Sequence, residues 1–234
     1  MNGASKIRSI SVWIFILPFL SINTCLILST QFHEIYSSQE FKLYNSLWPY
    51  LDGGTSISRI ARPFPNWLIF KPAMFLTSFL LIKYWYYNRD LILNIDNNYK
   101  HTKKIIFFGV GSAIALTIHA LLLGIKLDYS LYKLFRRVIM FIFIFFEITA
   151  QAYLVAALYS FKGNIIEFIN IKILKIKLIL ISLLIVVAII AIPIISWPGN
   201  EFKFFKHALE WDYFLGVITF YLLTFFLWKK KTTK

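Results

Sequence analysis

The sequence predicts an all-α polytopic membrane protein: a six-transmembrane-helix bundle with both termini in the cytoplasm (N-in/C-in). Hydrophobic residues make up 59% and charged residues 15% of the 234-residue chain. A soluble domain averages about 45–50% apolar and about 25% charged residues. Six apolar windows are each long enough to cross a bilayer, which takes roughly 17–25 residues. Trp and Tyr residues gather near the window ends, as expected at membrane interfaces. We therefore expect a single membrane domain over residues 1–234.

The windows cover approximately residues 9–30, 66–87, 105–125, 134–159, 177–197 and 212–228. Lys6 and Arg8 precede the first window, which superficially fits a signal peptide. The apolar run over 10–28 is too long for a typical signal-peptide core, and no clean cleavage site follows it, so we expect a retained first helix. Lys71 and Lys83 lie near the ends of the second window, where long side chains can reach the headgroups.

The net charge of +14 would suggest a nucleic-acid partner in a soluble protein. Here most Lys and Arg residues flank apolar windows, which favours anionic lipid headgroups as partners. No nucleic-acid-binding module or glycine-rich phosphate loop is recognisable. More of the 25 Lys and Arg residues fall on the cytoplasmic side of an N-in chain than outside it, which favours that orientation. The cytoplasmic set includes Lys172, Lys175 and Lys177.

Composition does not decide which membrane holds the protein. We expect the plasma (inner) membrane for a bacterial protein, and an endomembrane or the plasma membrane for a eukaryotic one. Membrane lipids are the expected partners. A protein partner or a homo-oligomer remains open.

The connection between the first two windows contains PYLDGGTSISRIARPFPNW, a polar and turn-rich stretch over residues 49–67. Asp52 and the two glycines after it indicate a turn. Arg59 and Arg62 are three residues apart and would share one face of a short helix, and a guanidinium group matches phosphate oxygens. Two interpretations stay open. The arginines bind lipid headgroups, or they hold the outer loops together through Asp52, Glu210 or Asp212.

Two ionisable residues fall deep inside the windows, namely His119 in the third and Glu147 in the fourth. A carboxylate at this depth is costly and usually faces the bundle interior. Gln151 lies one turn from Glu147 on the same face. Because the third and fourth helices should pack antiparallel, we expect His119 and Glu147 at similar depth, close enough to pair. The roles left open are a polar clamp, a proton relay or substrate site, and a protonated Glu147 without a role.

Little in the sequence indicates catalysis or metal binding. Cys25 is the one cysteine, which excludes an intrachain disulfide and a thiolate–zinc cluster. His207 and Glu210 precede the sixth window three residues apart, but no further ligands accompany them, so we expect no metal and no cofactor. A role in capping the sixth helix is favoured, since acidic side chains stabilise helix N-termini. No serine nucleophile elbow or Cys–His pair is present, and we predict no catalytic residues.

Three segments resemble the Frag1/DRAM/Sfk1 family, which includes the PGAP2-like proteins and the N-terminal part of Cwh43. These are LDGGTSISRIARPFP in the first outer loop, IFKPAM opening the second helix and LEWDYF opening the last. The resemblance would cover essentially the whole chain. The family's loop motif is nearer to S-D-x-G followed by proline, whereas TSISRIAR separates glycines from prolines here. The family-like positions are Asp52, Gly53, Pro63, Pro65, Glu210 and Trp211.

The resemblance implies a role in lipid handling, and we expect a non-enzymatic role in organising or remodelling membrane lipids. We expect the outer loops to pack into one cap that faces the headgroups, with a charge network of Asp52, Arg59, Arg62, Glu210 and Asp212. Two other functions remain open. One is a small transporter or channel with a polar path through His119, Glu147 and Gln151. The other is an intramembrane lipid hydrolase or acyltransferase that uses His207 and Glu210.

Overall fold

The structure, a computed structural model, describes residues 2–32, 35, 48–125, 130–196 and 202–229. It confirms the all-α six-helix bundle. The long helices are α1 (Asn2–Gln31), α4 (Asn66–Ile95), α5 (Thr102–Leu122), α6 (Ser130–Ser160), α8 (Ile171–Ser196) and α9 (Lys203–Leu227). All six are long and apolar enough to cross a membrane. The chain is therefore an integral, multi-pass membrane protein. The short helices are α2 (Pro49–Asp52), α3 (Ile57–Ile60) and α7 (Lys162–Ile165).

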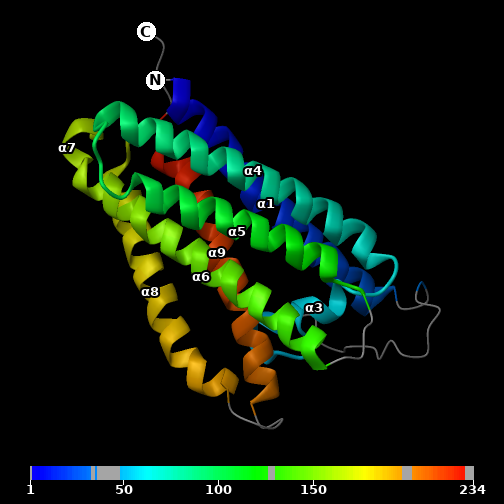
Figure 1. The fold of residues 1–234 in the computed structure, drawn as a ribbon. Helices are drawn as coiled ribbons and strands as arrows, with labels where there is room; N and C mark the ends of the chain where they lie inside the picture. The colour runs from blue at the N-terminus through cyan, green and yellow to red at the C-terminus, as the bar shows by residue number, and fades with distance from the viewer. Residues whose placement is uncertain (1, 33–34, 36–47, 126–129, 197–201, 230–234) are drawn as a thin grey trace.

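The six long helices run alongside one another (Figure 1), and their contacts make a closed ring in chain order. Each packs against the next, and α9 closes the ring by packing against α1. At this closure the Arg8 Nε–H donates a hydrogen bond to the carbonyl of Phe225, over 3.2 Å. We call this end of the bundle, where α1 begins and α9 ends, the terminal end. The opposite end, which carries α2 and α3, is the loop end. Side chains that face the ring axis can meet partners from several helices.

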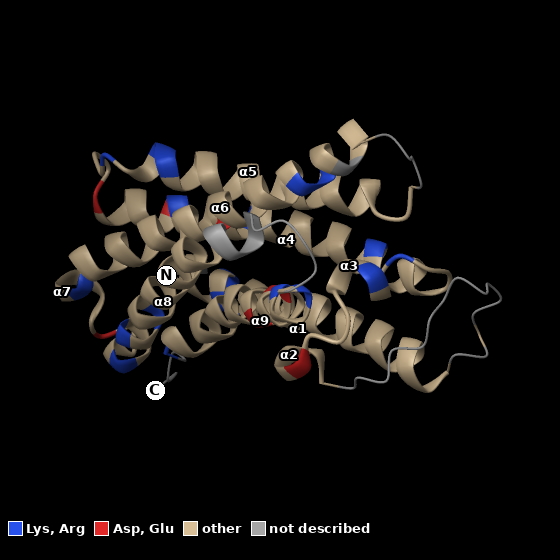
Figure 2. Cartoon of the chain, turned by 90° about the horizontal axis from the view of Figure 1, so that it is seen from below, with Lys and Arg blue, Asp and Glu red and all other residues tan. Residues whose placement is uncertain are grey.

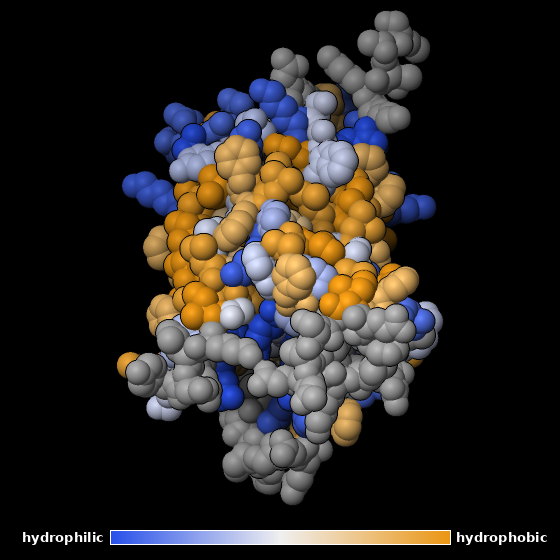
Figure 3. Space-filling model, turned by 90° about the vertical axis from the view of Figure 1, so that its right-hand side faces the viewer, coloured by the Kyte–Doolittle hydropathy of each residue, from blue (hydrophilic) through white to orange (hydrophobic). Residues whose placement is uncertain are grey.

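The outer surface of the bundle is apolar around its middle. Figure 3 shows an apolar band below the hydrophilic terminal end. Leu20, Phe145, Ile179 and Phe226 are each more than half exposed, which is expected for side chains that face lipid. Lys and Arg residues gather around α7 and the start of α8 at one end and around α3 at the other (Figure 2). A band of this kind flanked by charge fits a bundle whose long axis crosses the bilayer.

The helices extend beyond most of the predicted windows, and the largest difference is at α9. This helix begins at Lys203, not near residue 212, so His207, Glu210 and Asp212 lie inside it. The expectation that His207 and Glu210 precede and cap the last helix is therefore wrong. A hydropathy window ends where polar residues become frequent, whereas a helix continues through the interfacial layer because its backbone must stay hydrogen-bonded near lipid.

Candidate functional site

Glu147 lies in the interior of the ring and is 1% exposed. Its carboxyl group forms hydrogen bonds within α6 and with α5 and α9. Its Oε1 accepts a hydrogen bond from Gln151 Nε2 at 2.8 Å and another from the hydroxyl of Tyr221 on α9. Its Oε2 lies 2.6 Å from the Ser112 hydroxyl on α5. The amide of Gln151 also reaches the carbonyl of Val217 over 3.3 Å. A single carboxyl group thus joins α5, α6 and α9.

The hydrogen bonds around Glu147 can be satisfied with or without a proton on the carboxyl group. Ser112 Oγ lies within 2.8 Å of the Gly109 carbonyl as well as 2.6 Å from Glu147 Oε2. A hydroxyl group carries one donor and two acceptor sites. It can donate to an ionised Glu147, or it can accept from a protonated Glu147 and donate to Gly109. The surrounding hydrogen bonds are therefore compatible with either protonation state of Glu147.

Lys177 on α8 is the second ionisable residue of the interior and is 0% exposed. Its Nζ donates a hydrogen bond to Thr224 Oγ1 at 2.6 Å and lies 3.7 Å from the centroid of the Phe220 ring. Within the described part of the chain, the one salt bridge joins Arg89 and Asp90, so Lys177 meets a hydroxyl and a ring there and no carboxylate. The prediction that groups Lys177 with the basic residues flanking the fifth helix is wrong, since its side chain points into the bundle.

Two tyrosines connect the surroundings of Lys177 with those of Glu147. Thr224 donates to the Phe220 carbonyl, so it accepts from both Lys177 and the Tyr84 hydroxyl, the latter 3.3 Å away. The ring of Tyr84 packs edge-on against that of Tyr221, with centroids 5.0 Å apart. We call the resulting set the polar row: Ser112, Glu147, Gln151, Tyr221, Tyr84, Thr224 and Lys177.

The polar row runs along part of the bundle axis. The start of α8 and the end of α6 lie at the same end of the bundle. At 1.5 Å per residue, Lys177 lies about 9 Å from the start of α8, and Glu147 lies about 20 Å from the end of α6. Both distances are measured from the terminal end. Lys177 therefore lies near that end and Glu147 near the middle of the bundle. All members of the row are buried.

The structure does not pair His119 with Glu147. Ser112 is the residue of α5 at the depth of Glu147, and His119 lies about 10 Å farther toward the loop end. Its Nδ1 has no hydrogen-bond partner among the residues that the structure describes, and the charge of Arg136 acts on it. The antiparallel packing of α5 and α6 is as expected, but His119 belongs to the last turns of α5 while Glu147 is central in α6.

A second cluster of polar contacts lies at the loop end, where the segment around α2 and α3 packs on the first turns of α9. His207 Nδ1 is hydrogen-bonded to the Gly53 carbonyl over 2.9 Å, and Trp211 Nε1 donates to the Thr55 carbonyl over 2.9 Å. Glu210 accepts a hydrogen bond from the backbone of Ser58. We call this set the loop cap: Gly53, Thr55, Ser58, His207, Glu210 and Trp211. It brings together three of the family-like positions, Gly53, Glu210 and Trp211.

The other predicted residues of this region surround the loop cap. Asp52 Oδ1 accepts a hydrogen bond from the backbone of Gly54 at 2.8 Å and so shapes the turn. Arg59 is exposed on α3 and close enough to act on the charge of Glu210. The structure places Arg62, Pro63 and Pro65 between α3 and α4, with a cis peptide bond before Pro65.

Asp212 is exposed on α9. Burial raises the pKa of the Tyr50 hydroxyl, and the charge of Asp212 raises it further, so these two side chains lie near each other. The full charge network of Asp52, Arg59, Arg62, Glu210 and Asp212 stays a prediction. Most of the connection over 31–47 lies outside the described residues.

No group of three or more His, Cys, Asp or Glu residues within the described ranges could hold a metal ion. Comparison of the chain with models of protein families, with curated proteins and with solved structures found no match. Membership of the Frag1/DRAM/Sfk1 family therefore stays a prediction, and the polar row and the loop cap are the two features of the structure that bear on function.

Proposed function

We propose that the protein is a small proton-linked membrane transporter in which Glu147 takes up and releases the proton. The observation that carries the proposal is the burial of Glu147 and Lys177 in one polar row without a direct bond between them. Ionisable side chains inside a membrane bundle are costly and commonly mark ion or proton paths. A clamp between helices needs neither charge, because apolar residues of similar volume often stabilise as well as a buried ion pair.

The polar row contains groups that can pass a proton between its two ends. Lys177 would give a proton to Thr224. The Thr224 hydroxyl, which donates to the Phe220 carbonyl in the structure, would turn toward Tyr84 and give its own proton to the Tyr84 hydroxyl. Tyr84 would pass its proton to Tyr221, and Tyr221 its proton to Glu147 Oε1, so that one proton moves in total. The 3.3 Å contact of Thr224 with Tyr84 suits this exchange. The step between the tyrosines requires rotation of their hydroxyl groups or a water molecule, since the rings meet edge to face.

The experiment is proton flux into vesicles that contain the purified full-length protein and a pH-sensitive dye. Under an imposed pH gradient, Glu147→Gln and Lys177→Met should each reduce the flux at least about tenfold. The matched controls are Glu167→Gln and Lys175→Met, because Glu167 and Lys175 are exposed. Both controls should behave like the wild type. A folded Glu147→Gln protein with unchanged flux would contradict the proposal.

Infrared difference spectroscopy tests the proton site without any transport assay. A pH change should alter the carbonyl stretch of a protonated carboxyl group, and Glu147→Gln should remove that band while Glu167→Gln keeps it. A band that persists in Glu147→Gln would assign the titration to another carboxyl group and overturn the role of Glu147.

A second candidate function is lipid organisation through the loop cap. It is favoured by the way His207 and Trp211 fasten the α2–α3 segment onto α9 while Arg59 stays exposed. Native mass spectrometry with lipid analysis can compare the wild type with Arg59→Ala/Arg62→Ala. The charge-matched control is Arg136→Ala/Arg137→Ala on α6. Selective loss of one lipid class in the first variant alone supports this function, and equal lipid content in all three proteins excludes it.

A further inference from the structure

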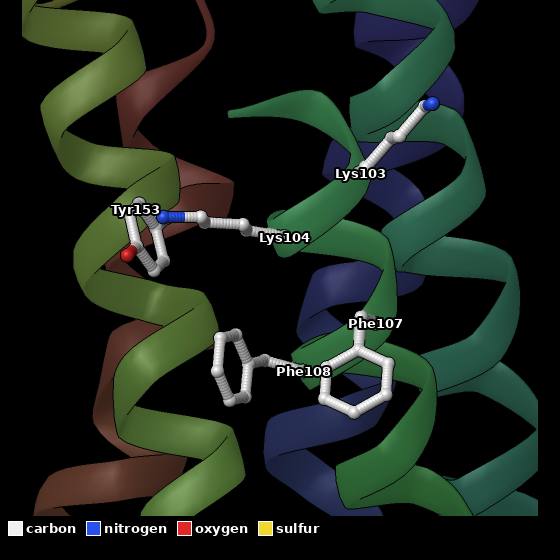
Figure 4. A pocket seen from close by; sticks show the side chains of 5 residues that line it. All are labelled: Lys103, Lys104, Phe107, Phe108 and Tyr153. Carbon is white, nitrogen blue, oxygen red and sulfur yellow. The ribbon is translucent and has the colours of Figure 1, made fainter. Parts of the chain in front are cut away.

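A groove of about 350 Å³ lies between α5 and α6 near the terminal end, far from the loop cap. Its lining consists of Lys103, Lys104, Phe107, Phe108 and Tyr153 (Figure 4). The first four residues come from the first two turns of α5, and Tyr153 comes from α6. We call it the aromatic groove. It does not overlap with the polar row and plays no part in the proposed proton transfer.

The lining changes from charged to apolar with depth. The two lysines stand in the first turn of α5, and the two phenylalanines stand four residues later, about 6 Å farther from the terminal end. Lys104 extends across the groove toward Tyr153, with its Nζ 5.6 Å from the ring centroid, while Lys103 extends to the other side of α5 (Figure 4). This order matches a phospholipid, whose phosphate lies at the membrane surface and whose acyl chains lie below it.

Aromatic rings form the floor of the groove. The rings of Phe108 and Tyr153 are nearly parallel, with centroids 6.1 Å apart, and Phe108 also packs edge-on against Phe146 at 5.2 Å. Phe107 is 63% exposed and turns its ring toward the outside of the bundle. An acyl chain could therefore lie on Phe107 and Phe108 without any displacement of the helices.

The charge at the groove is positive. Lys103 and Lys104 are exposed, and neither takes part in a salt bridge with any residue that the structure describes. Lys100 and Lys162 lie at the same end of the bundle and are exposed as well. Such clusters beside a transmembrane helix attract anionic headgroups.

We infer that the aromatic groove binds one anionic phospholipid from the leaflet at the terminal end. Its phosphate would contact Lys104, with Lys103 at the rim, and an acyl chain would follow Phe107 and Phe108. The charge complementarity and the depth order of the lining favour a lipid over a soluble anion, because a soluble anion has no acyl chain that could pack on the apolar floor.

The first experiment is native mass spectrometry of the detergent-purified full chain with an equimolar mixture of phosphatidylglycerol and phosphatidylcholine. The wild type should retain one phosphatidylglycerol selectively, and Lys103→Ala/Lys104→Ala should lower that selectivity at least fivefold. Lys172→Ala/Lys175→Ala removes the same charge from exposed positions at the start of α8 and should retain it. Equal selectivity in all three proteins, or an equal loss in both variants, would overturn the groove as the site.

A photo-crosslinking experiment tests the acyl-chain contact separately. A benzoylphenylalanine in place of Phe107 should capture phosphatidylglycerol from vesicles that contain both lipids. The same probe in place of Phe141, which is 51% exposed on α6, should capture the two lipids in proportion to their abundance. Capture without preference at both positions would overturn the proposal even if the lysines proved selective for charge.

Discussion

At Gly53 the absence of a side chain decides whether the outer loop can reach α9. The backbone there is left-handed, with φ at +60°, and a Cβ atom would lie 1.7 Å from the carbonyl oxygen of Phe204. The Gly53 carbonyl is in turn bonded to His207. A glycine at this position therefore permits both the turn and the close approach of two backbones, which anchors the loop cap.

We predict that Gly53→Ala lowers the free energy of unfolding substantially. The left-handed backbone alone costs about 1–2 kcal/mol for an L-residue, and the clash with Phe204 adds to it because that neighbour is backbone and cannot rotate away. Thermal unfolding in detergent is the measurement. Gly163→Ala is the matched control, since no atom of the described residues lies within 4 Å of a Cβ there. A Gly53→Ala protein as stable as the control would mean that the loop does not pack on α9 as described.

The sequence predicts the position of some interior residues and not of others. Glu147 and Gln151 were recognisable as interior residues because a carboxylate in an apolar window has few other places to go. Lys177 was not recognisable as an interior residue, because it follows Lys172 and Lys175 closely in the sequence and both of these are exposed. Only the rotation of α8 against α9 decides which lysine points inward. The sequence does not single out Tyr84, Tyr221 and Thr224, because such residues are common in membrane helices.

Among the elements, α5 packs closely against its neighbours on both sides through glycines. A Cβ atom at Gly109 would lie 2.3 Å from the ring of Trp85 on α4, and one at Gly111 would lie 2.5 Å from the ring of Phe146 on α6. Trp85 is 0% exposed, whereas Phe146 is partly exposed. The two contacts are alike in distance and differ in the freedom of the ring to move.

We predict that Gly109→Ala destabilises the bundle more than Gly111→Ala does. Overpacking a buried contact costs about 1–3 kcal/mol, and Trp85 is fully buried. Phe146 can rotate toward lipid and relieve most of the clash. The measurement is the difference in thermal unfolding temperature between the two variants. Equal destabilisation would show that the α4–α5 and α5–α6 contacts are equally rigid.

The hydropathy pattern predicted the long elements well and their ends poorly. A run of apolar residues reports the solvent that a whole segment prefers, and all six windows correspond to helices of the structure. It does not report where the helical backbone stops in the interfacial layer. The stretch KFFKHALEWD is polar enough to end a window, yet it forms the first turns of α9. The loop cap depends on those turns and so could not be assembled from the windows.

At the scale of the whole molecule, the closed ring places the start of α1 and the end of α9 together. The orientation of that end in the membrane rests on the distribution of basic residues. It decides from which side a proton would enter the polar row, because Lys177 lies near the terminal end. It also decides which leaflet would supply the lipid of the aromatic groove. The orientation in the membrane therefore sets the side of proton entry and the leaflet of the bound lipid.

Cysteine labelling can determine the orientation with little disturbance of the fold. Cys25 is buried and can be replaced by alanine to give a background without cysteine. Leu51 is 83% exposed at the loop end, and Lys100 is exposed at the terminal end. With both termini in the cytoplasm, Leu51→Cys should react with a membrane-impermeant maleimide in intact cells, and Lys100→Cys only after the membrane is opened. The reverse pattern would contradict the predicted orientation, and would mean that the polar row is entered from outside the cell and that the groove faces the outer leaflet.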